Sequence, residues 1–308
     1  MLPRQLLPVI LLSLVGSGSA QTCPAGKKLP TAKPIAIGKV IFRNAGLLTA
    51  DQRREISASV RKSASQPVNI NEELGRFDEG LAVSSLADEA AERVRAAYQN
   101  QGYFTVQVEG RAAKAEGYSV PYDILIQVDN IGNQYRLADL NIINAIQFPN
   151  QQLRDLFPIQ RGEIFSREKI AKGLEDLRSL YGSQGYIGMT AVPYTDFDKD
   201  NAIANLTLDI DEGRQFRVRS IGVLGVDHEA EARILTEMEL QPGSIYTSGA
   251  WERSIRMFPN IAPNDPVVEQ KKVDAEKGWV DIVLDLRKHA PCPLDMSVST
   301  AVDLHQPR

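Results

Sequence analysis

The chain has few of the residues from which metal sites, catalytic centres and stacking grooves are built. Its 308 residues include 2 cysteines and 3 histidines, and aromatic residues make up 6%. We therefore expect no metal cluster and no groove that stacks sugars or bases. The charges are nearly balanced, with 35 Lys and Arg against 39 Asp and Glu, a net charge of −4 and no basic stripe. This balance argues against nucleic acid as a partner.

Long hydrophobic runs are also missing, apart from a short one at the start. Arg4, the apolar run 6–15 and the small residues at 18–20 are together typical of a secretory signal peptide, so we expect residues 1–20 to be removed. No later segment approaches the roughly 20 apolar residues that a membrane-spanning helix needs. The prediction is an exported chain without a membrane anchor.

The two cysteines, Cys23 and Cys292, lie near opposite ends of the chain. In the oxidising compartment that a signal peptide implies, they permit one disulfide. The segment from Cys23 to Ile37 spans at most about 45–50 Å even when extended, so domains arranged in a row would keep the two sulfur atoms apart. A Cys23–Cys292 disulfide therefore stays an open possibility.

The most informative feature is a repeat. Tyr-x-x-Gln-Gly-Tyr occurs at 98–103 and again at 181–186, each time after a helical pattern and before a strand-like run. At an offset of 81 residues, Tyr135-Arg-Leu also aligns with Phe216-Arg-Val, and Gly162-x-Ile-Phe-Ser with Gly243-x-Ile-Tyr-Thr. The chain therefore holds three copies of one unit, and repeats of this kind build scaffolds and binding surfaces.

Each copy begins with a predicted strand and a short helix. The strands have period-2 patterns and span 37–42, 137–142 and 218–223. Residues suited to a helix start follow each strand: Thr49 with Gln52, Pro149, and Asp227.

A second, longer helix is predicted next in the first two copies. Its apolar residues recur at steps of three and four, so one face packs inward. They are Ala87, Ala90, Val94, Ala97 and Tyr98 in the first copy, and Ile170, Leu174, Leu177 and Tyr181 in the second. Gly102 and Gly185 follow at the position where a left-handed residue ends a helix.

Two strands close each copy as a hairpin. The predicted pairs are 104–109 with 123–128, 189–194 with 204–210, and 267–273 with 280–286. The fold class is therefore α+β, with tandem β-α-α-β-β units, each a three-stranded mixed sheet covered by two helices.

This order and its motifs resemble the POTRA (polypeptide-transport-associated) domain, the periplasmic module of bacterial outer-membrane assembly and secretion proteins. The second copy carries the resemblance best, through Gly162-x-Ile-Phe-Ser, the helix end at 180–186 and the strand at 205–213. The third copy lacks the helix-end motif and is divergent. The expected organisation is a tail at 21–35, POTRA-like units at 36–134, 135–215 and 216–288, and a tail at 289–308.

The resemblance implies a non-enzymatic periplasmic module, associated with the outer membrane, that uses no cofactor and no metal. Its expected partners are an outer-membrane β-barrel protein or unfolded outer-membrane clients, bound by strand addition to an exposed sheet edge. In the family the second strand of the unit lies at that edge, where Pro193 would limit pairing at its own position. The implied contact residues are Phe104, Val106, Val108, Met189, Ala191 and Val192.

Only 20 residues follow Lys288, too few for a transmembrane barrel of at least eight strands of about 9–11 residues. The expectation is a free-standing module or a barrel-less fragment of an outer-membrane assembly protein. A secreted binding protein or enzyme that reuses the fold is the alternative.

Other polar motifs have simpler interpretations. His228, His289 and His305 lack the neighbouring residues of a catalytic motif, so we expect no catalysis from them. The run Asp196-x-Asp198-x-Asp200 begins like a calcium loop but lacks the later glycine and glutamate, which favours a solvated hairpin turn. Two tryptophans, at positions 251 and 279, are predicted to pack rather than to bind a ligand.

Overall fold

The computed structural model describes residues 34–66, 79–114, 121–256 and 268–286. The expected signal peptide, both cysteines, His289, His305 and the C-terminal tail lie outside these ranges. Among the helices described, none combines the length and the apolar character needed to cross a bilayer.

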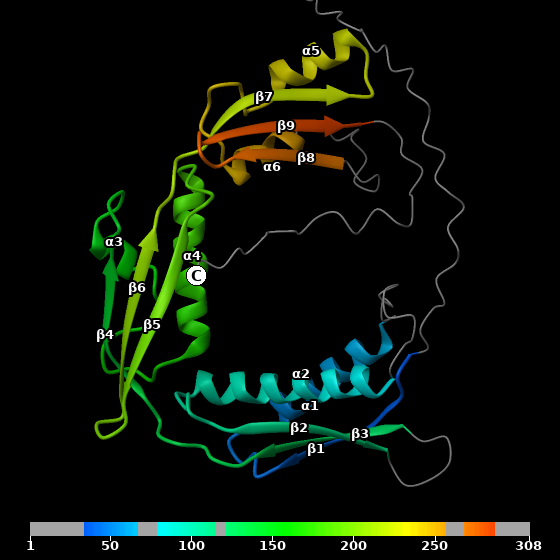
Figure 1. Ribbon diagram of the computed structural model, residues 1–308, viewed down its shortest axis with the longest axis vertical. Coiled ribbons are helices and arrows are strands. Elements are labelled where there is room, and N and C mark those ends of the chain that lie inside the picture. Colours follow the sequence, from blue (N-terminus) through cyan, green and yellow to red (C-terminus); the bar gives the residue numbers. More distant parts are fainter. Residues whose placement is uncertain (1–33, 67–78, 115–120, 257–267, 287–308) are drawn as a thin grey trace, which may run out of the picture. The chain divides into compact units, whose positions relative to one another are not determined.

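Three separate three-stranded sheets account for all the strands described (Figure 1). We call the sheets and their helices units 1, 2 and 3, in chain order. In each, the first strand pairs in parallel with the last, and the middle strand of the sequence pairs antiparallel with the last. The last strand is therefore central in every sheet, and the predicted mixed α+β fold is confirmed.

Unit 1 consists of β1 (Ile37–Arg43), α1 (Ala50–Ser65), α2 (Glu79–Asn100), β2 (Val108–Lys114) and β3 (Tyr122–Val128). Unit 2 consists of β4 (Arg136–Ile143), α3 (Asn150–Arg154), α4 (Arg167–Ser183), β5 (Thr190–Asp198) and β6 (Ile203–Asp211). Unit 3 consists of β7 (Arg217–Leu224), α5 (His228–Glu237), α6 (Ser248–Arg256), β8 (Val268–Asp274) and β9 (Trp279–Asp285).

The first helix of each unit is predicted to be short, but its length differs among the units, and the prediction is wrong for unit 1. In unit 1 the predicted capping box is present, with the Thr49 side chain bonded to the Gln52 backbone and the Gln52 side chain to the Thr49 backbone. This helix has 16 residues because Ile56, Val60 and Ala64 bury a complete apolar stripe. Its counterpart in unit 2 has 5 residues and begins after Pro149.

The long helices α2 and α4 bury the apolar face that their spacing predicts. Tyr98 and Tyr181, in the last turn of each helix, are both 0% exposed. Gly102 and Gly185 follow with φ of +90° and +87°, so the chain reverses there at little steric cost. Within unit 2, α4 runs along one face of the sheet (Figure 1). The other face of that sheet is free of helices within the unit.

Candidate functional site

The sheet order places β2, β5 and β8 at one edge of their sheets, as the family resemblance implied for the second strand. The opposite edges belong to β1, β4 and β7. An edge strand presents backbone N–H and C=O groups that an extended peptide can pair with. The side chains and segments that lie against each edge decide whether it is available.

Two residues predicted for the edge of unit 1 lie outside the strand. β2 begins at Val108, four residues later than predicted, so Phe104 and Val106 precede it. Val106 and Val108 are 5% and 8% exposed and belong to the core of unit 1. Phe104 instead packs into the core of unit 2, against Phe165 and Phe197. The period-2 pattern predicts one continuous strand because it does not show which core receives each side chain.

The predicted edge residues of unit 2 lie at the beginning of a longer strand. Met189 precedes β5 by one residue and is buried, Ala191 is half-buried, and Val192 is exposed. β5 continues to Asp198, beyond the predicted end at position 194. Pro193 lies within it, opposite Leu208 of β6. The strand therefore offers more edge than the sequence indicated.

The outer edges of β4 and β7 are paired with their own chain. Leu137 donates its backbone N–H to the Glu163 oxygen at 2.9 Å and accepts from the Gly162 N–H at 2.7 Å. Val218 makes the corresponding pair of bonds with Ser244 and Gly243, at 2.9 and 2.7 Å. The loop before the second helix thus occupies the first part of this edge in units 2 and 3.

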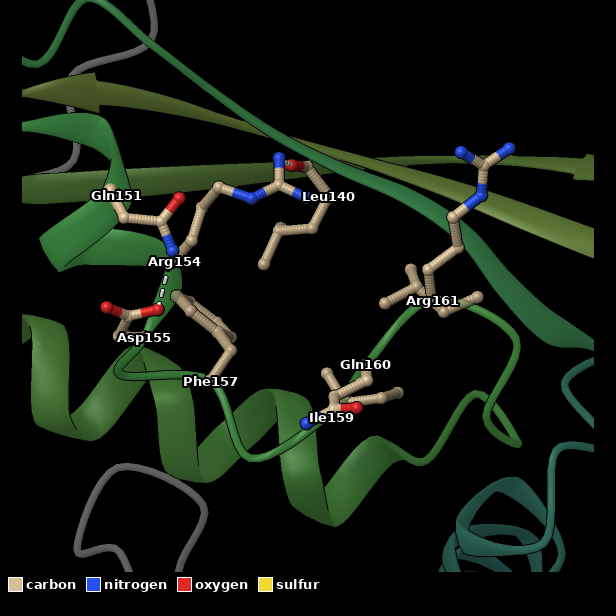
Figure 2. A pocket seen from close by; sticks show the side chains of 9 residues that line it. Leu140, Gln151, Arg154, Asp155, Phe157, Ile159, Gln160 and Arg161 are labelled. Atoms are coloured by element: carbon tan, nitrogen blue, oxygen red, sulfur yellow. Dashed lines mark hydrogen bonds between the residues drawn. The ribbon is translucent and has the colours of Figure 1, made fainter.

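A cleft of about 310 Å³ opens beside the covered edge of β4 (Figure 2). Leu137, Leu140, Phe157 and Ile159 supply its apolar lining. The polar residues around it are Gln151, Arg154, Asp155, Gln160 and Arg161. Arg154 bonds to the Leu140 carbonyl oxygen and to the Asp139 carboxylate, so it closes another part of the β4 edge. The lining contains no His, Cys, Ser or Lys, and we assign no reaction to it.

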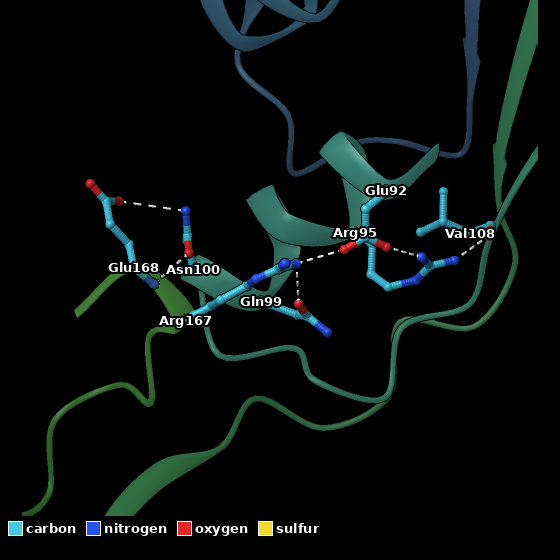
Figure 3. Close-up of polar contacts among 7 residues, drawn as sticks. All are labelled: Glu92, Arg95, Gln99, Asn100, Val108, Arg167 and Glu168. Atoms are coloured by element: carbon cyan, nitrogen blue, oxygen red, sulfur yellow. Dashed lines mark hydrogen bonds and ion pairs between the residues drawn. The ribbon is translucent and has the colours of Figure 1, made fainter. Parts of the chain in front are cut away.

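The end of unit 1 and the start of α4 are joined by polar contacts that the sequence had not indicated (Figure 3). The Arg167 Nη1 atom lies 2.7 Å from Glu92 Oε1 and 3.0 Å from Gln99 Oε1, both on α2. Asn100 accepts the free backbone N–H of Glu168 at 2.9 Å, which satisfies a donor at the beginning of α4. Arg167 is the largest cause of the lowered pKa of Glu92.

The backbone of this junction is repeated between units 2 and 3. The Tyr135 N–H donates to the Gly102 oxygen at 2.9 Å, and the Phe216 N–H donates to the Gly185 oxygen at 2.8 Å. The side chain of the glutamine that precedes each aromatic residue also bonds across the junction. Gln134 donates to the Gln101 backbone oxygen at 2.8 Å, and Gln215 donates to the Gln184 backbone oxygen at 2.9 Å. Consecutive units are therefore joined in the same way. A signal for this was present, because both glutamines precede an aromatic residue at the repeat offset.

A buried carboxylate stabilises unit 2 near the end of α4. Glu212 is 9% exposed, and its Oε1 atom accepts from the Tyr181 hydroxyl and from the Ile146 and Gln147 N–H groups, each at 2.8 Å. Burial alone would raise the pKa of Glu212, but these three donors together hold the pKa below its usual value of 4.5. Burial and the adjacent carboxylate raise the pKa of Tyr181 well above its usual value. These groups tie the helix end to the sheet and lie in the core.

Other predicted sites have structural roles. The Asp198 side chain accepts from the Asp200 and Asn201 N–H groups, each at 3.0 Å, as in a hairpin turn. Among the residues described, no group of three or more His, Cys, Asp or Glu side chains is arranged to hold a metal ion. Trp251 is 3% exposed in the core of unit 3, and His228 is exposed at the start of α5.

Three comparisons bear on these geometries. The POTRA family model, described as a surface antigen variable number repeat, matches residues 135–213. A candidate outer membrane protein assembly factor of Treponema pallidum (strain Nichols) is 23% identical over 216 residues, which are 69% of this chain and 26% of that protein. The outer membrane protein assembly factor BamA of Neorickettsia risticii (strain Illinois) is 22% identical over 192 residues, 62% of this chain and 25% of that protein.

The chain thus spans about a quarter of the length of these curated relatives. Among solved structures, POTRA domains 3–5 of Haemophilus influenzae BamA superpose with a TM-score of 0.59 at 20% identity, covering 85% of this chain and all of that one. At this identity the match speaks for the fold. Residues 135–213 thus match the POTRA family model, and the three tandem units have the fold of the POTRA domains of BamA.

Proposed function

We propose that this chain is a non-enzymatic periplasmic scaffold that binds extended segments of outer-membrane proteins by adding them to a sheet edge. The observation that carries the proposal is the sheet topology, which leaves the middle strand of each unit at an edge, while the opposite edges of units 2 and 3 are paired internally at their first residues. Backbone pairing at such an edge makes little demand on sequence, which suits clients of many sequences.

The relatives and the predicted signal peptide support the proposed location. Two curated relatives are named for outer-membrane protein assembly, and residues 1–20 have the composition of a secretory signal. We therefore place the protein in the periplasm, beside the outer membrane. Its partners would be an outer-membrane β-barrel protein or the unfolded clients of such an assembly system.

Site-specific photo-crosslinking tests this function. A photo-reactive residue is placed at Ala113 on β2 or Thr195 on β5, with Ser85 and Ser179 on exposed helix faces as matched controls. The variants are mixed with a urea-unfolded outer-membrane β-barrel protein during dilution from urea. Crosslinks at one or both edge positions, and not at the helix positions, are the expected result. Equal capture at all four positions, or none at any, would reject strand addition.

A further inference from the structure

The edge strands β2 and β5 differ in how much of their edge is free to pair with a peptide. What we infer from this difference rests on the proposed function. In β5, all five residues from Val192 to Asp196 are exposed, with Val192 at 46% and Tyr194 at 58%. In the corresponding strand of unit 1, exposed and more buried residues alternate. β5 therefore leaves both of its faces open in the middle of the strand, whereas β2 does not.

The helix of unit 1 closes the edge of β2. Gly110 of β2 lies so close to α2 that a Cβ atom there would be 2.0 Å from the Ala87 carbonyl oxygen and 3.2 Å from the Ala91 Cβ atom. Arg95 of the same helix donates from Nη2 to the Val108 carbonyl oxygen at 3.0 Å (Figure 3). A peptide that paired with this strand would meet the helix and would have to displace the arginine.

Nothing comparable lies against β5 within the part of the chain that the structure describes. The side chains from Val192 to Asp196 make no hydrogen bond or ion pair with other described residues, and their backbone pairing is the ladder to β6. Pro193 fits an edge of this kind, because a proline in a sheet keeps its nitrogen on the unpaired side. By strand alternation, Ala191 and Thr195 then direct their N–H groups outward with it.

The side chains beside this edge define the chemistry of an added strand. Val192 and Tyr194 lie on the face away from α4, opposite Asp209 and Thr207 of β6. Acidic residues flank them on the same face, Asp196 in β5 and Asp211 opposite Thr190. Cross-strand neighbours interact directly, so apolar residues would lie opposite Val192 and Tyr194 and basic residues beyond them.

We infer that β5 of unit 2, and not β2 of unit 1, receives the client, and that the client is an unfolded barrel strand with alternating apolar residues and a Lys or Arg at its ends. The lengths agree, because β5 has 9 residues and a transmembrane β-strand has about 9–11. Such strands alternate apolar and polar residues, as the two open faces of β5 require.

Binding of defined peptides tests the inference. The probe is a fluorescein-labelled ten-residue peptide with Val, Leu and Tyr at alternate positions, Thr and Gln between them, and Lys at both ends. Two matched peptides have Glu at both ends or N-methyl groups on alternate backbone nitrogens. Fluorescence anisotropy in low salt should give a Kd at least fivefold lower for the Lys peptide than for the Glu peptide, and no binding of the N-methylated one.

Variants of the full chain locate the site. Thr195→Pro removes an outward N–H from β5 and should weaken binding at least tenfold, whereas Ala112→Pro, which removes an outward N–H from β2, should leave it unchanged. Asp196→Lys alters a side chain that is exposed and unbonded among the described residues, and it should reverse the preference between Lys and Glu peptides. Circular dichroism of each variant confirms that it is folded.

The outcomes distinguish failure of this inference from failure of the proposed strand addition on which it rests. Loss of binding in the β2 variant alone would overturn the choice of β5 and leave strand addition intact. Equal affinity for the Lys and Glu peptides would overturn the proposed client chemistry. Full binding of the N-methylated peptide would overturn strand addition itself. Self-association that Thr195→Pro abolishes, measured by analytical ultracentrifugation without peptide, would assign the edge to a second copy of this chain.

Discussion

The ring centroid of Phe104 lies 4.7 Å from that of Phe165, which brings a side chain from the end of unit 1 into the core of unit 2. The same ring also lies 5.5 Å from the ring of Phe197. One repeat later, Ile187 packs against the core of unit 3. Each junction therefore adds an apolar side chain to the following core, in addition to the hydrogen bonds between the backbones.

Replacement of Phe104 by alanine should destabilise unit 2 more than unit 1. Large-to-small changes of buried aromatic residues cost about 3–5 kcal/mol, and a half-buried ring should cost about 2–3 kcal/mol. Hydrogen exchange would show faster opening of β6 than of β3. Ile146→Ala, at a side chain that is 83% exposed in unit 2, is the control. Equal acceleration in both sheets would contradict a specific contribution to unit 2.

Much of this fold could be predicted because local chemistry and tertiary structure agree. The capping box at Thr49, the buried face that ends at Tyr181 and the positive φ of Gly185 all follow from spacing and residue type. The destination of Phe104 could not be predicted in this way. Its alternation with Val106 fits one continuous strand, and only the three-dimensional path shows that the two side chains enter different cores.

The sequence also could not predict that the edge of unit 2 is more open than that of unit 1. The sequence predicts equivalent edge positions in β2 and β5, because both strands follow a Gln-Gly-Tyr motif. What separates the two edges is a long-range contact between Gly110 and Ala87 and the reach of Arg95. Neither contact has a periodic signature.

The junction between units 2 and 3 can be tested at Gly185, where a Cβ atom would lie 2.4 Å from the Ile245 Cγ2 atom. Gly162 has nearly the same φ, +86° against +87°, but nothing within 4 Å of its Cβ position. Alanine at either site should cost about 1–2 kcal/mol from the left-handed backbone. Gly185→Ala should cost about 1 kcal/mol more and should speed exchange of the Phe216 N–H. Equal effects of both variants would show that Ile245 yields without strain.

The ion pair between Glu92 and Arg167 should contribute little in comparison. Both side chains are about half exposed, 48% and 45%, and exposed pairs are worth about 0–1 kcal/mol. A double-mutant cycle with Glu92→Gln and Arg167→Gln, read from urea midpoints, should give a coupling energy below about 1 kcal/mol that shrinks further in high salt. A larger, salt-independent coupling would mean that the pair is less hydrated than its exposure indicates.

The buried carboxylate of Glu212 should make the stability of unit 2 sensitive to acid. Its pKa in the folded protein is below 4.5, while in the unfolded chain it should be close to that usual value. The favourable contribution is thus complete above about pH 4.5. Below that pH the unfolded chain takes up a proton first, so the free energy of unfolding falls until the pH drops through the lower, folded-state pKa.

Glu212→Gln isolates this effect, because glutamine keeps an acceptor oxygen for Tyr181 and the two backbone N–H groups but cannot ionise. The variant should be about 1–2 kcal/mol less stable than the natural chain at pH 7, since bonds to a charged acceptor are the stronger ones. That deficit should shrink between pH 4.5 and pH 3, because the other carboxylates titrate alike in both proteins. Urea midpoints at each pH give the comparison. A deficit that stays constant down to pH 3 would mean that the three donors do not favour the ionised form.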